Sequence, residues 1–375
     1  MAIKSIGIDI REATEKGAGK GRYTLELTRA LIKTTESAHS AQLNQPSQSN
    51  QPSPSFYLFT KKANPLFTST DRVHQIVISG RGLFWHLNLR RYLKQAPVGI
   101  FISPTSVLYP ALAPKKQKTA IVVHDLITFL HSKTHPWFPT IVERLTLPHA
   151  LKKTHLIICV SEHTKKDLHH LFPTTINKAT VVVSPAVSPD IYPVDTQKMD
   201  LPQDYLLGVG TLLPRKNFSV LIHAFALIHE KYPTLHLCIA GHSAQRSISV
   251  HLKNLPTNIR HRLHFLGYVS TPQLCELYTR ARMLVFPSTY EGFGIPPLEA
   301  MACGCPVIVS NASSLPEVVA DAALQVDPHN PVEIAQAIEK MLLTKNAMEY
   351  RQKGLKRIQT FSWEKSAQKL LDQLR

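Results

Sequence analysis

Residues 282–310 read RMLVFPSTYEGFGIPPLEAMACGCPVIVS, and this stretch shows the alternation of apolar runs and helical spacing that recurs through both halves of the chain. Two short apolar runs, 282–288 and 306–310, flank a glycine-bearing loop and a segment with helical spacing. Apolar runs of this length that alternate with helices are typical of parallel strands covered on both faces. The stretch therefore predicts a strand, a loop, a short helix and a second, parallel strand.

The same alternation continues on both sides of this stretch. Further apolar runs occur at 5–10, 56–59, 98–103, 120–125, 155–161 and 179–184, and then at 205–210, 235–241 and 262–267. A chain of 375 residues exceeds the usual size of one hydrophobic core. We therefore predict an α/β protein with two doubly wound, Rossmann-like domains.

The proline-rich segment 184–195 marks the boundary between the predicted domains, which cover residues 1–195 and 196–358. Residues 36–55 have almost no apolar side chains and are interpreted as a disordered insertion in the first domain. Helix starts are indicated by Thr271 before Pro272 and by Asn330 before Pro331, because a capping side chain followed by proline favours the first helical turn.

The composition limits the cellular setting and the partners. No run approaches the roughly 18 apolar residues of a membrane-spanning helix. The N-terminus shows no signal-peptide pattern, so a cytoplasmic protein is expected. Five cysteines without paired spacing are interpreted as free, mostly buried thiols. The formal net charge of +17, most of it before residue 196, suits an anionic partner: a membrane surface, a nucleic acid or a phosphorylated substrate.

Loops that follow strands are the candidate sites, because open α/β sheets bind ligands beyond the carboxyl ends of their strands. In 208–225, a glycine-bearing strand end precedes Arg215 and Lys216 next to the start of a helix. Adjacent cations and the unpaired N–H groups of a helix N-terminus suit a diphosphate. An ordinary solvated turn is the alternative, and the glycine spacing of a Walker loop is missing here.

Two carboxylates lie in the stretch quoted first. Glu291 falls in the loop, and Glu299 falls about two turns further on, inside the following helix. Carboxylates accept strong hydrogen bonds from sugar hydroxyls, and the intervening glycines let backbone approach a phosphate closely. Paired glutamates on a helix are also common as surface charge, so this pattern alone leaves both interpretations open.

The segment 291–324, EGFGIPPLEAMACGCPVIVSNASSLPEVVADAAL, resembles the Glu-x7-Glu signature of retaining glycosyltransferases of family 4, which have the GT-B fold. Other segments resemble motifs of that family in the same order: GAGKGRYTLEL, IVVHDL, CVSEHTKKDL, GTLLPRKN and FSWEKSAQKLL. The resemblance covers nearly the whole chain and is closest to bacterial mannosyltransferase-like members. It implies two domains that face each other across a cleft and a C-terminal helix, within 359–375, that crosses back to the first domain.

The resemblance also implies roles for particular residues. Glu299 would bind the donor ribose, and Glu291 would hold sugar hydroxyls, while Arg215 and Lys216 would neutralise the leaving diphosphate. His124, at a strand end, would face the transferred sugar or the acceptor. The other residues expected at the donor are Gly19, Gly21, Gly210, Thr211, Gly267, Tyr268, Gly292, Phe293, Gly294 and Ile295.

One departure from the family pattern concerns the phosphate loop. Many relatives have Arg directly after its glycine, whereas this chain has Thr211, so the phosphate charge would depend more heavily on Arg215 and Lys216.

The expected function is transfer of a hexose, with mannose from GDP-mannose first, to a saccharide or lipid-linked acceptor with retention of configuration. A UDP-sugar-dependent, glucosyl-type transferase and a non-catalytic nucleotide-sugar-binding protein are the alternatives. No Asp-x-Asp motif occurs, and His131 and His135 lack companions at ligand spacing, so neither a metal nor a cofactor besides the donor is expected. Nucleic acid is not expected as a partner.

Residues 82–94, GLFWHLNLRRYLK, mix apolar side chains with three cations at roughly helical spacing. This pattern is typical of a helix in a membrane interface, which would bring the protein to the inner face of an anionic membrane. The alternative is that the helix packs on the sheet of the first domain.

Overall fold

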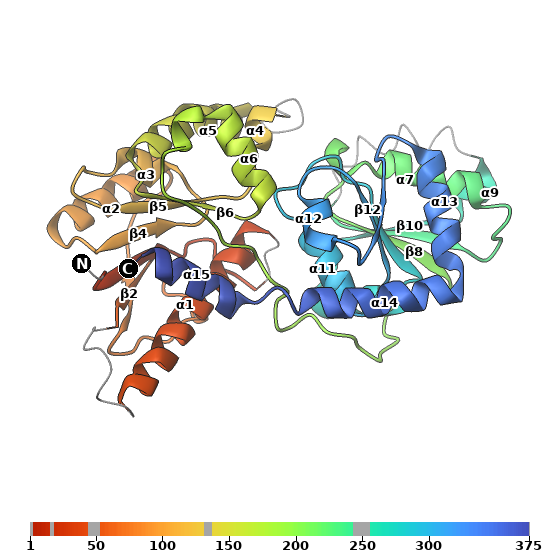
Figure 1. Ribbon diagram of the computed structural model, residues 1–375, viewed down its shortest axis with the longest axis horizontal. Coiled ribbons are helices and arrows are strands. Elements are labelled where there is room, and N and C mark those ends of the chain that lie inside the picture. Colours follow the sequence, from red (N-terminus) through yellow and green to blue (C-terminus); the bar gives the residue numbers. More distant parts are fainter. Residues whose placement is uncertain (1–2, 16–18, 44–52, 131–136, 243–255, 375) are drawn as a thin grey trace. The chain divides into compact units, whose positions relative to one another are not determined.

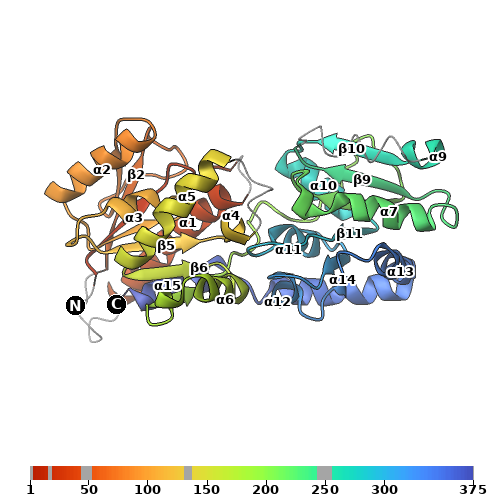
Figure 2. The same ribbon diagram turned by 90° about the horizontal axis from the view of Figure 1, so that it is seen from above.

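The computed structural model describes residues 3–15, 19–43, 53–130, 137–242 and 256–374. The chain divides into two compact units, Met1–Pro185 with Ser362–Arg375 and Ala186–Phe361. Figures 1 and 2 show that each unit is a sheet with helices on both of its faces. The predicted α/β class with two parallel-sheet, Rossmann-like domains is therefore confirmed.

The sheet of unit 1 has seven parallel strands in the order β3-β2-β1-β4-β5-β6-β7. The strands are β1 (Ser5–Asp9), β2 (Ser55–Thr60), β3 (Val73–Val77), β4 (Ile100–Ser103), β5 (Thr119–Val123), β6 (Leu156–Cys159) and β7 (Thr180–Val182). The helices are α1 (Lys20–Leu43), α2 (Leu83–Gln95), α3 (Leu108–Leu112), α4 (Ile127–Leu130), α5 (Trp137–Lys153), α6 (Glu162–Leu171) and α15 (Trp363–Gln373). A short 3-10 helix, η2, spans Pro173–Thr175.

The sheet of unit 2 has six parallel strands in the order β10-β9-β8-β11-β12-β13. The strands are β8 (Tyr205–Val209), β9 (His236–Ala240), β10 (Leu263–Gly267), β11 (Met283–Phe286), β12 (Val307–Ser310) and β13 (Leu324–Val326). Around them lie η3 (Pro214–Lys216), α7 (Phe218–Ile228), α9 (Thr257–Arg260), α10 (Thr271–Arg280), α11 (Ile295–Ala302), α12 (Leu315–Val319), α13 (Pro331–Leu342) and α14 (Thr344–Ile358).

In each sheet the chain runs outward in one direction and then returns to the other side of its first strand. The reversal falls between β1 and β4 in unit 1 and between β8 and β11 in unit 2. At each reversal, the loops after the two neighbouring strands run to opposite sides of the sheet. A crevice forms between these loops, and ligands of open α/β sheets bind there. The topology therefore directs attention to the loops after these four strands.

Two strands at the sheet edges were absent from the sequence prediction. β3 and β13 each lie at one of the two edges of their sheet. Val73 is the one fully buried residue of β3, and Val77 is 55% exposed. Edge strands that are half exposed carry polar residues and so lack the continuous apolar run by which the central strands were predicted.

The domain boundaries differ from the prediction at both crossings, the two places where the chain passes from one unit to the other. Unit 2 begins at Ala186 rather than at 196, because residues after the crossing pack on α10. The Cys275 thiol donates to Asp190 O at 3.6 Å, and Val194 N donates to Thr279 Oγ1 at 3.2 Å. Unit 2 also continues to Phe361 instead of ending at 358.

The disordered insertion predicted for residues 36–55 is wrong at both ends. α1 continues to Leu43, and β2 begins at Ser55. Extending an existing helix costs far less than nucleating a new one, and ESAHSAQL contains good helix formers. The remaining part, 44–52, lies outside the described residues.

The last helix belongs to unit 1 and packs along α1. The Trp363 ring lies edge-on to the Tyr23 ring, with centroids 5.5 Å apart. Ser366 Oγ donates to Ser184 O at 2.6 Å, which ties the helix to the end of the first crossing. Figure 1 shows α15 beside α1, although the two are far apart in the sequence.

Two features of the sequence analysis can be compared directly with these elements. All five cysteines are free and buried, as predicted. Asn330 caps α13 through hydrogen bonds from Val332 N and Glu333 N, whereas α10 starts one residue earlier than predicted, with Ser270 as its cap. None of the described helices combines the length and the apolar character that crossing a bilayer requires.

Candidate active site

The loops after β8 and β11 lie side by side in unit 2, because the strand order reverses between these two strands. Thr289 N donates to Arg215 O at 2.8 Å, and Thr289 Oγ1 donates to the same oxygen at 3.2 Å. These bonds fix the η3 turn, which carries Arg215 and Lys216, against the loop that carries Glu291.

One oxygen of the Glu291 carboxylate accepts hydrogen bonds from three donors. Oε1 accepts from Arg215 Nη1 at 3.0 Å, from Lys216 Nζ at 2.5 Å and from Ser288 Oγ at 2.6 Å. The side chains of Glu291 and Lys216 are only 12% and 9% exposed. We call Arg215, Lys216, Ser288 and Glu291 the charge cluster. It brings together three residues that the sequence analysis selected and one, Ser288, that it did not.

The charge cluster pairs two basic side chains with one carboxylate. Burial alone would raise the pKa of the Glu291 carboxyl, but Lys216 and Arg215 beside it lower that pKa below its ordinary value. Burial lowers the pKa of Lys216, and the Glu291 carboxylate opposes this shift. Two cations thus share one carboxylate in a largely buried place, which is a preformed site for additional negative charge.

Backbone geometry makes room for Lys216. Its ammonium group lies 4.6 Å from the centre of the Phe286 ring. Gly210 has φ +142°, and a Cβ there would come within 3.1 Å of Lys216 Cε. The Lys216 side chain therefore runs past Gly210, as expected where a glycine lets other atoms approach the backbone. Thr211, the next residue, is exposed.

Two serines hold the loop before α11. Glu291 N donates to Ser313 Oγ at 2.9 Å, while Ser314 Oγ donates to Phe293 O at 2.7 Å and lies 2.9 Å from Glu291 O. These serines lie in the stretch NASSLPEV, which is part of the family resemblance, but nothing in their spacing pointed to backbone contacts. They keep the backbone of residues 291–293 in one conformation.

The loop ends at a glycine that no other residue could replace without strain. Gly294 has φ +110°, and a Cβ there would lie 2.6 Å from Leu315 Cδ2. Ile295 is the first residue of α11, so the loop delivers the chain directly to a helix N-terminus. Gly292, between the charge cluster and this turn, is partly exposed.

Glu299 has different surroundings from Glu291. It lies in α11 with 7% of its surface exposed, and its Oε2 accepts a hydrogen bond from the Tyr278 hydroxyl at 3.1 Å. Tyr278 is fully buried in α10 and was not selected from the sequence. A buried hydroxyl that donates to one carboxylate oxygen fixes the orientation of the Glu299 side chain.

Gly267 and Tyr268 lie at the carboxyl end of β10, two strands from β8 in the same sheet. Gly267 has φ +66°, and its carbonyl accepts from Gly241 N at 2.8 Å. Tyr268 is 66% exposed. These two residues share a sheet edge with the charge cluster.

In unit 1, His124 directly follows β5. Its Nε2 lies 2.7 Å from Pro104 O, so this nitrogen carries the proton and donates it to the carbonyl. Its ring contacts the Tyr23 ring edge-on at 5.0 Å. Burial, reinforced by the charge of Lys20, lowers the pKa of His124 to about 4. The imidazole is therefore neutral at physiological pH.

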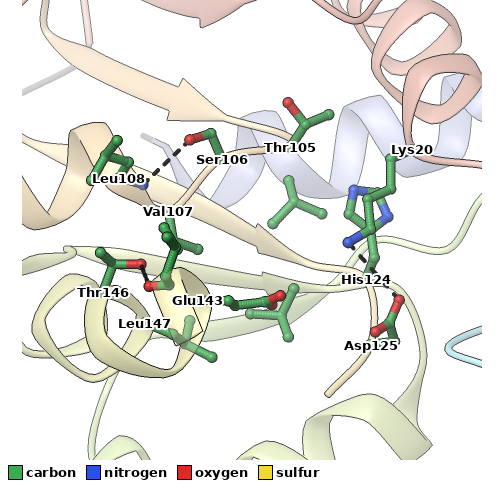
Figure 3. A pocket seen from close by; sticks show the side chains of 13 residues that line it. Lys20, Thr105, Ser106, Val107, Leu108, His124, Asp125, Glu143, Thr146 and Leu147 are labelled. Carbon is green, nitrogen blue, oxygen red and sulfur yellow. Dashed lines mark hydrogen bonds and ion pairs between the residues drawn. The ribbon is translucent and has the colours of Figure 1, made fainter. Parts of the chain in front are cut away.

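His124 lines a cavity of about 280 Å³ in unit 1, shown in Figure 3. Its walls come from the start of α1, the loop after β4, the end of β5 and α5. Lys20 Nζ lies 4.0 Å from Asp125 Oδ2. Glu143 and Thr146, from α5, also line the cavity and were not predicted, because their helix has no motif that marks them.

The two glycines predicted beside this site have different roles. Gly19 has φ +67° and precedes the first residue of α1, with open space where a side chain would be. A Cβ on Gly21 would lie 2.5 Å from Glu12 O, so Gly21 allows α1 to pass close to the chain after β1.

Metal ligation finds no support in the part of the chain that the structure describes, which contains no group of three or more His, Cys, Asp or Glu suited to hold an ion. His131 and His135 lie outside the described residues.

Comparisons with known proteins agree with this arrangement. The family model described as glycosyl transferases group 1 matches residues 195–357. The chain is 33% identical over 267 residues to the O-antigen chain mannosyltransferase B of Escherichia coli, an alignment that covers 68% of this chain and 69% of that protein. It is 29% identical over 265 residues to the serotype-specific mannosyltransferase WbdA of Escherichia coli, covering 67% of this chain but 32% of that protein.

Among solved structures, the sucrose-phosphate synthase from Thermosynechococcus elongatus matches 98% of this chain and 97% of that chain, with a TM-score of 0.73 and 19% identity. This likeness establishes that the fold is GT-B. Together with the family model and the first relative, it gives one conclusion: the chain belongs to the group 1 glycosyltransferases.

Proposed function

We propose that this protein transfers a hexose from a nucleotide-diphosphate sugar to a saccharide or lipid-linked acceptor, with retention of configuration and with GDP-mannose as the first donor to test. The observation that carries the proposal is the charge cluster, in which Arg215 and Lys216 converge on one carboxylate oxygen of Glu291. Their surplus positive charge suits a leaving nucleoside diphosphate, whose charge grows as the glycosidic bond breaks.

The cluster still has a hydrogen-bond donor to offer. The Nε–H of Arg215 is buried and has no hydrogen-bond partner among the described residues. A buried donor without a partner is costly, so a phosphate oxygen that accepts from it would be bound more tightly than at an exposed arginine. Glu291 holds both cations in position, so they need little rearrangement when charge develops.

In this proposal the remaining donor contacts surround the charge cluster. The backbone of Gly292, Phe293 and Gly294 approaches the diphosphate, and Glu299, oriented by Tyr278, accepts from the ribose hydroxyls. The departing phosphate oxygen takes the proton of the acceptor hydroxyl on the same face from which it leaves, which retains the configuration. No metal takes part, so transfer is expected to persist in a chelator.

Mannose is placed first because the relatives aligned above are named as mannosyltransferases. A panel of GDP-mannose, UDP-glucose and other UDP-sugars tests this order. Thermal shift reports binding, since a ligand that binds only the folded state raises the unfolding temperature, and release of nucleoside diphosphate reports turnover. Donor binding without transfer or hydrolysis would favour the non-catalytic alternative.

Lys216→Ala tests the role of the charge cluster. We expect turnover to fall by about 10²-fold or more, which is the scale measured when one electrostatic contact to a transition state is lost. Lys231→Ala is the matched control, because Lys231 is exposed and pairs with Glu339 at 2.6 Å, and neither residue belongs to the charge cluster. Near-normal kinetics of Lys216→Ala would contradict the proposal.

We also propose a peripheral contact with anionic membranes, through a smaller surface than the sequence analysis suggested. Trp85, Leu89 and Leu93 are buried in the core of unit 1, so most of the apolar face of α2 packs on the sheet. Leu83 and Phe84 remain 53% and 72% exposed, and the cations of the helix are exposed as well. Vesicle flotation with increasing anionic lipid tests this surface, and unchanged flotation of the Leu83→Ser, Phe84→Ser double variant would exclude it.

A further inference from the structure

Two cysteine thiols of unit 2 lie between helices α10 and α11. Cys275 comes one helical turn before Tyr278 in α10, and Cys303 caps the end of α11. Glu299 comes one turn before Cys303. The Tyr278 hydroxyl donates to Glu299 Oε2 at 3.1 Å, so the helix faces that carry these residues point toward each other. One turn along from this bond, the thiols of Cys275 and Cys303 share a hydrogen bond of their own.

This hydrogen bond makes the two thiols unequal. It lowers the pKa of Cys275 from the ordinary value of 9.0 to about 7, whereas the same bond, reinforced by burial, raises the pKa of Cys303. Cys275 is therefore partly ionised at neutral pH, and a thiolate is the nucleophile of thiol–disulfide exchange. Burial raises the pKa of each of the other three thiols to about 12: Cys159, Cys238 and Cys305.

A segment without regular secondary structure covers Cys275. The two thiols are only 1% and 2% exposed. The Cys275 thiol donates to Asp190 O at 3.6 Å, and the backbone of Tyr192 also hydrogen-bonds to the Cys275 sulfur. Asp190 and Tyr192 lie between β7 and β8, where the chain forms neither helix nor strand, and Tyr192 is 57% exposed. Local opening of such a segment costs much less than global unfolding, so it gives a small molecule access to Cys275.

We propose that Cys275 and Cys303 form a reversible disulfide, and that the pair is a modification site for small-molecule disulfides. The Cys275 thiolate attacks one sulfur of the small disulfide, which forms a mixed disulfide and releases one small thiolate. Cys303 then loses its proton, and its sulfur attacks the Cys275 sulfur and releases the second small thiolate. The two protein thiols lose two electrons to the small disulfide, and their two protons end on the two released thiols.

The disulfide has a consequence for the neighbouring carboxylate. An S–S bond of about 2.05 Å is much shorter than a hydrogen bond between two sulfur atoms, so α10 and α11 must shift next to the bond between Tyr278 and Glu299. Glu299 accepts from the ribose hydroxyls in the proposed function, so we expect oxidation to weaken donor binding. This consequence rests on the proposed function, whereas formation of the disulfide does not.

Treatment of the full chain with excess oxidised glutathione tests the site without any donor. Peptide mapping by mass spectrometry should find Cys275 and Cys303 in one cross-linked pair, with the other cysteines still free, and dithiothreitol should restore both thiols. The absence of this cross-link would overturn the proposal. A cross-link that forms only in denaturing urea would overturn it as well, because the folded pair would then be inert.

Two variants test the order of the steps. Cys303→Ser keeps a hydroxyl that can donate to Cys275 but has no second sulfur, so a glutathione adduct should accumulate on Cys275. Cys275→Ser should lose the reaction, leaving Cys303 unmodified at least tenfold longer than the wild-type pair. Cys159→Ser is the matched control, since Cys159 is another buried, free thiol and belongs to unit 1, and it should form the cross-link at the wild-type rate. Modification of Cys303 in Cys275→Ser at the wild-type rate would overturn the assignment of Cys275 as the attacking thiol.

Donor binding separates this proposal from the proposed function. Calorimetry of the reduced and the oxidised wild type should show about tenfold weaker donor binding after oxidation, which is the loss of one hydrogen bond to a charged group. Cys275→Ser given the same treatment should bind the donor as before. Equal donor affinity of the two wild-type forms would overturn the link to Glu299. If the reduced protein binds no nucleotide sugar, the proposed function fails, while the mapped cross-link still decides whether the disulfide forms.

Discussion

Glu291 accepts hydrogen bonds from Arg215, Lys216 and Ser288, so removing its charge leaves two cations in a largely buried place without a counter-ion. Breaking a buried ion pair by removing one partner costs about 3–5 kcal/mol. We therefore predict that Glu291→Gln lowers the free energy of unfolding by this order at pH 7, as well as reducing turnover. Urea denaturation of both proteins measures the difference.

The same variant predicts a dependence on pH. The folded-state pKa of Glu291 lies below its ordinary value of 4.5, so the stabilisation is complete above pH 4.5 and is lost as the pH falls through the lower, folded-state value. The difference between wild type and Glu291→Gln should therefore be constant from pH 7 to 5 and shrink below 4.5. A difference that stays constant in acid would show that the charge of Glu291 is not what stabilises the cluster.

His86 supports a separate prediction about acid sensitivity. It is 4% exposed in α2, and burial, reinforced by Arg11, lowers its pKa from 6.5 to about 4. The unfolded chain therefore binds the proton first, and stability is lost as the pH falls from 6.5 to 4. This group alone should cost roughly 2 kcal/mol between pH 7 and 5.

His86→Leu removes the titrating group and keeps an apolar side chain in the core. Its urea midpoint should fall less than that of the wild type between pH 7 and 5. Parallel pH profiles of the two proteins would show that His86 does not titrate in this range.

Arg215, Lys216 and Glu291 could be predicted as site residues from the sequence, because each is a charged residue in a loop that follows a buried strand. Ser288, Ser313 and Tyr278 could not be predicted in this way. Serine and tyrosine are common, and their role depends on contacts with backbone or with a carboxylate on another element. Such contacts follow from side-chain packing and leave no periodic pattern in the chain.

At the scale of elements, Asn217 joins η3 to α7 and decides how the cation-bearing turn is held. It adopts the left-handed conformation, with φ 59°, and its side-chain amide donates to Pro287 O at 3.2 Å and to Pro328 O at 2.5 Å. Asn217→Gly keeps the backbone conformation and loses both hydrogen bonds. Asn217→Ala loses the bonds and also places a Cβ in the left-handed region, at an extra cost of about 1–2 kcal/mol.

We therefore predict that unfolding temperatures decrease in the order wild type, Asn217→Gly, Asn217→Ala. Thermal denaturation followed by circular dichroism measures the order. If Asn217→Ala were as stable as Asn217→Gly, the left-handed backbone would not be a constraint on this turn.

The central strands could be predicted within a residue or two, since strands buried on both faces are continuous apolar runs, as at 120–125 for β5. The edge strands β3 and β13 and the end of α1 could not. Their residues are partly exposed, and their structure depends on the neighbouring strand or on the preceding turns of helix. Neither dependence is visible in local composition.

At the scale of the whole molecule, the division into two units predicts two separable unfolding transitions. Trp363 is 6% exposed in α15 and packs against Tyr23 in unit 1, whereas Asn217 lies in unit 2. Trp363→Ala should cost about 3–5 kcal/mol, as for other large buried side chains. In a domain of this size that loss lowers the unfolding temperature of unit 1 by roughly 10 °C.

Scanning calorimetry of the wild type, two single variants, their double variant and one control tests this division. Trp363→Ala should lower one transition, Asn217→Ala should lower the other, and the double variant should show both shifts with no further change, because distant and independent sites are additive. Glu364→Gln is the control next to Trp363, since the Glu364 side chain is 56% exposed and its pair with Lys33 contributes little. If both variants lowered one common transition, the two units would unfold as a single cooperative body, because a defect in either would then be shared by the whole chain.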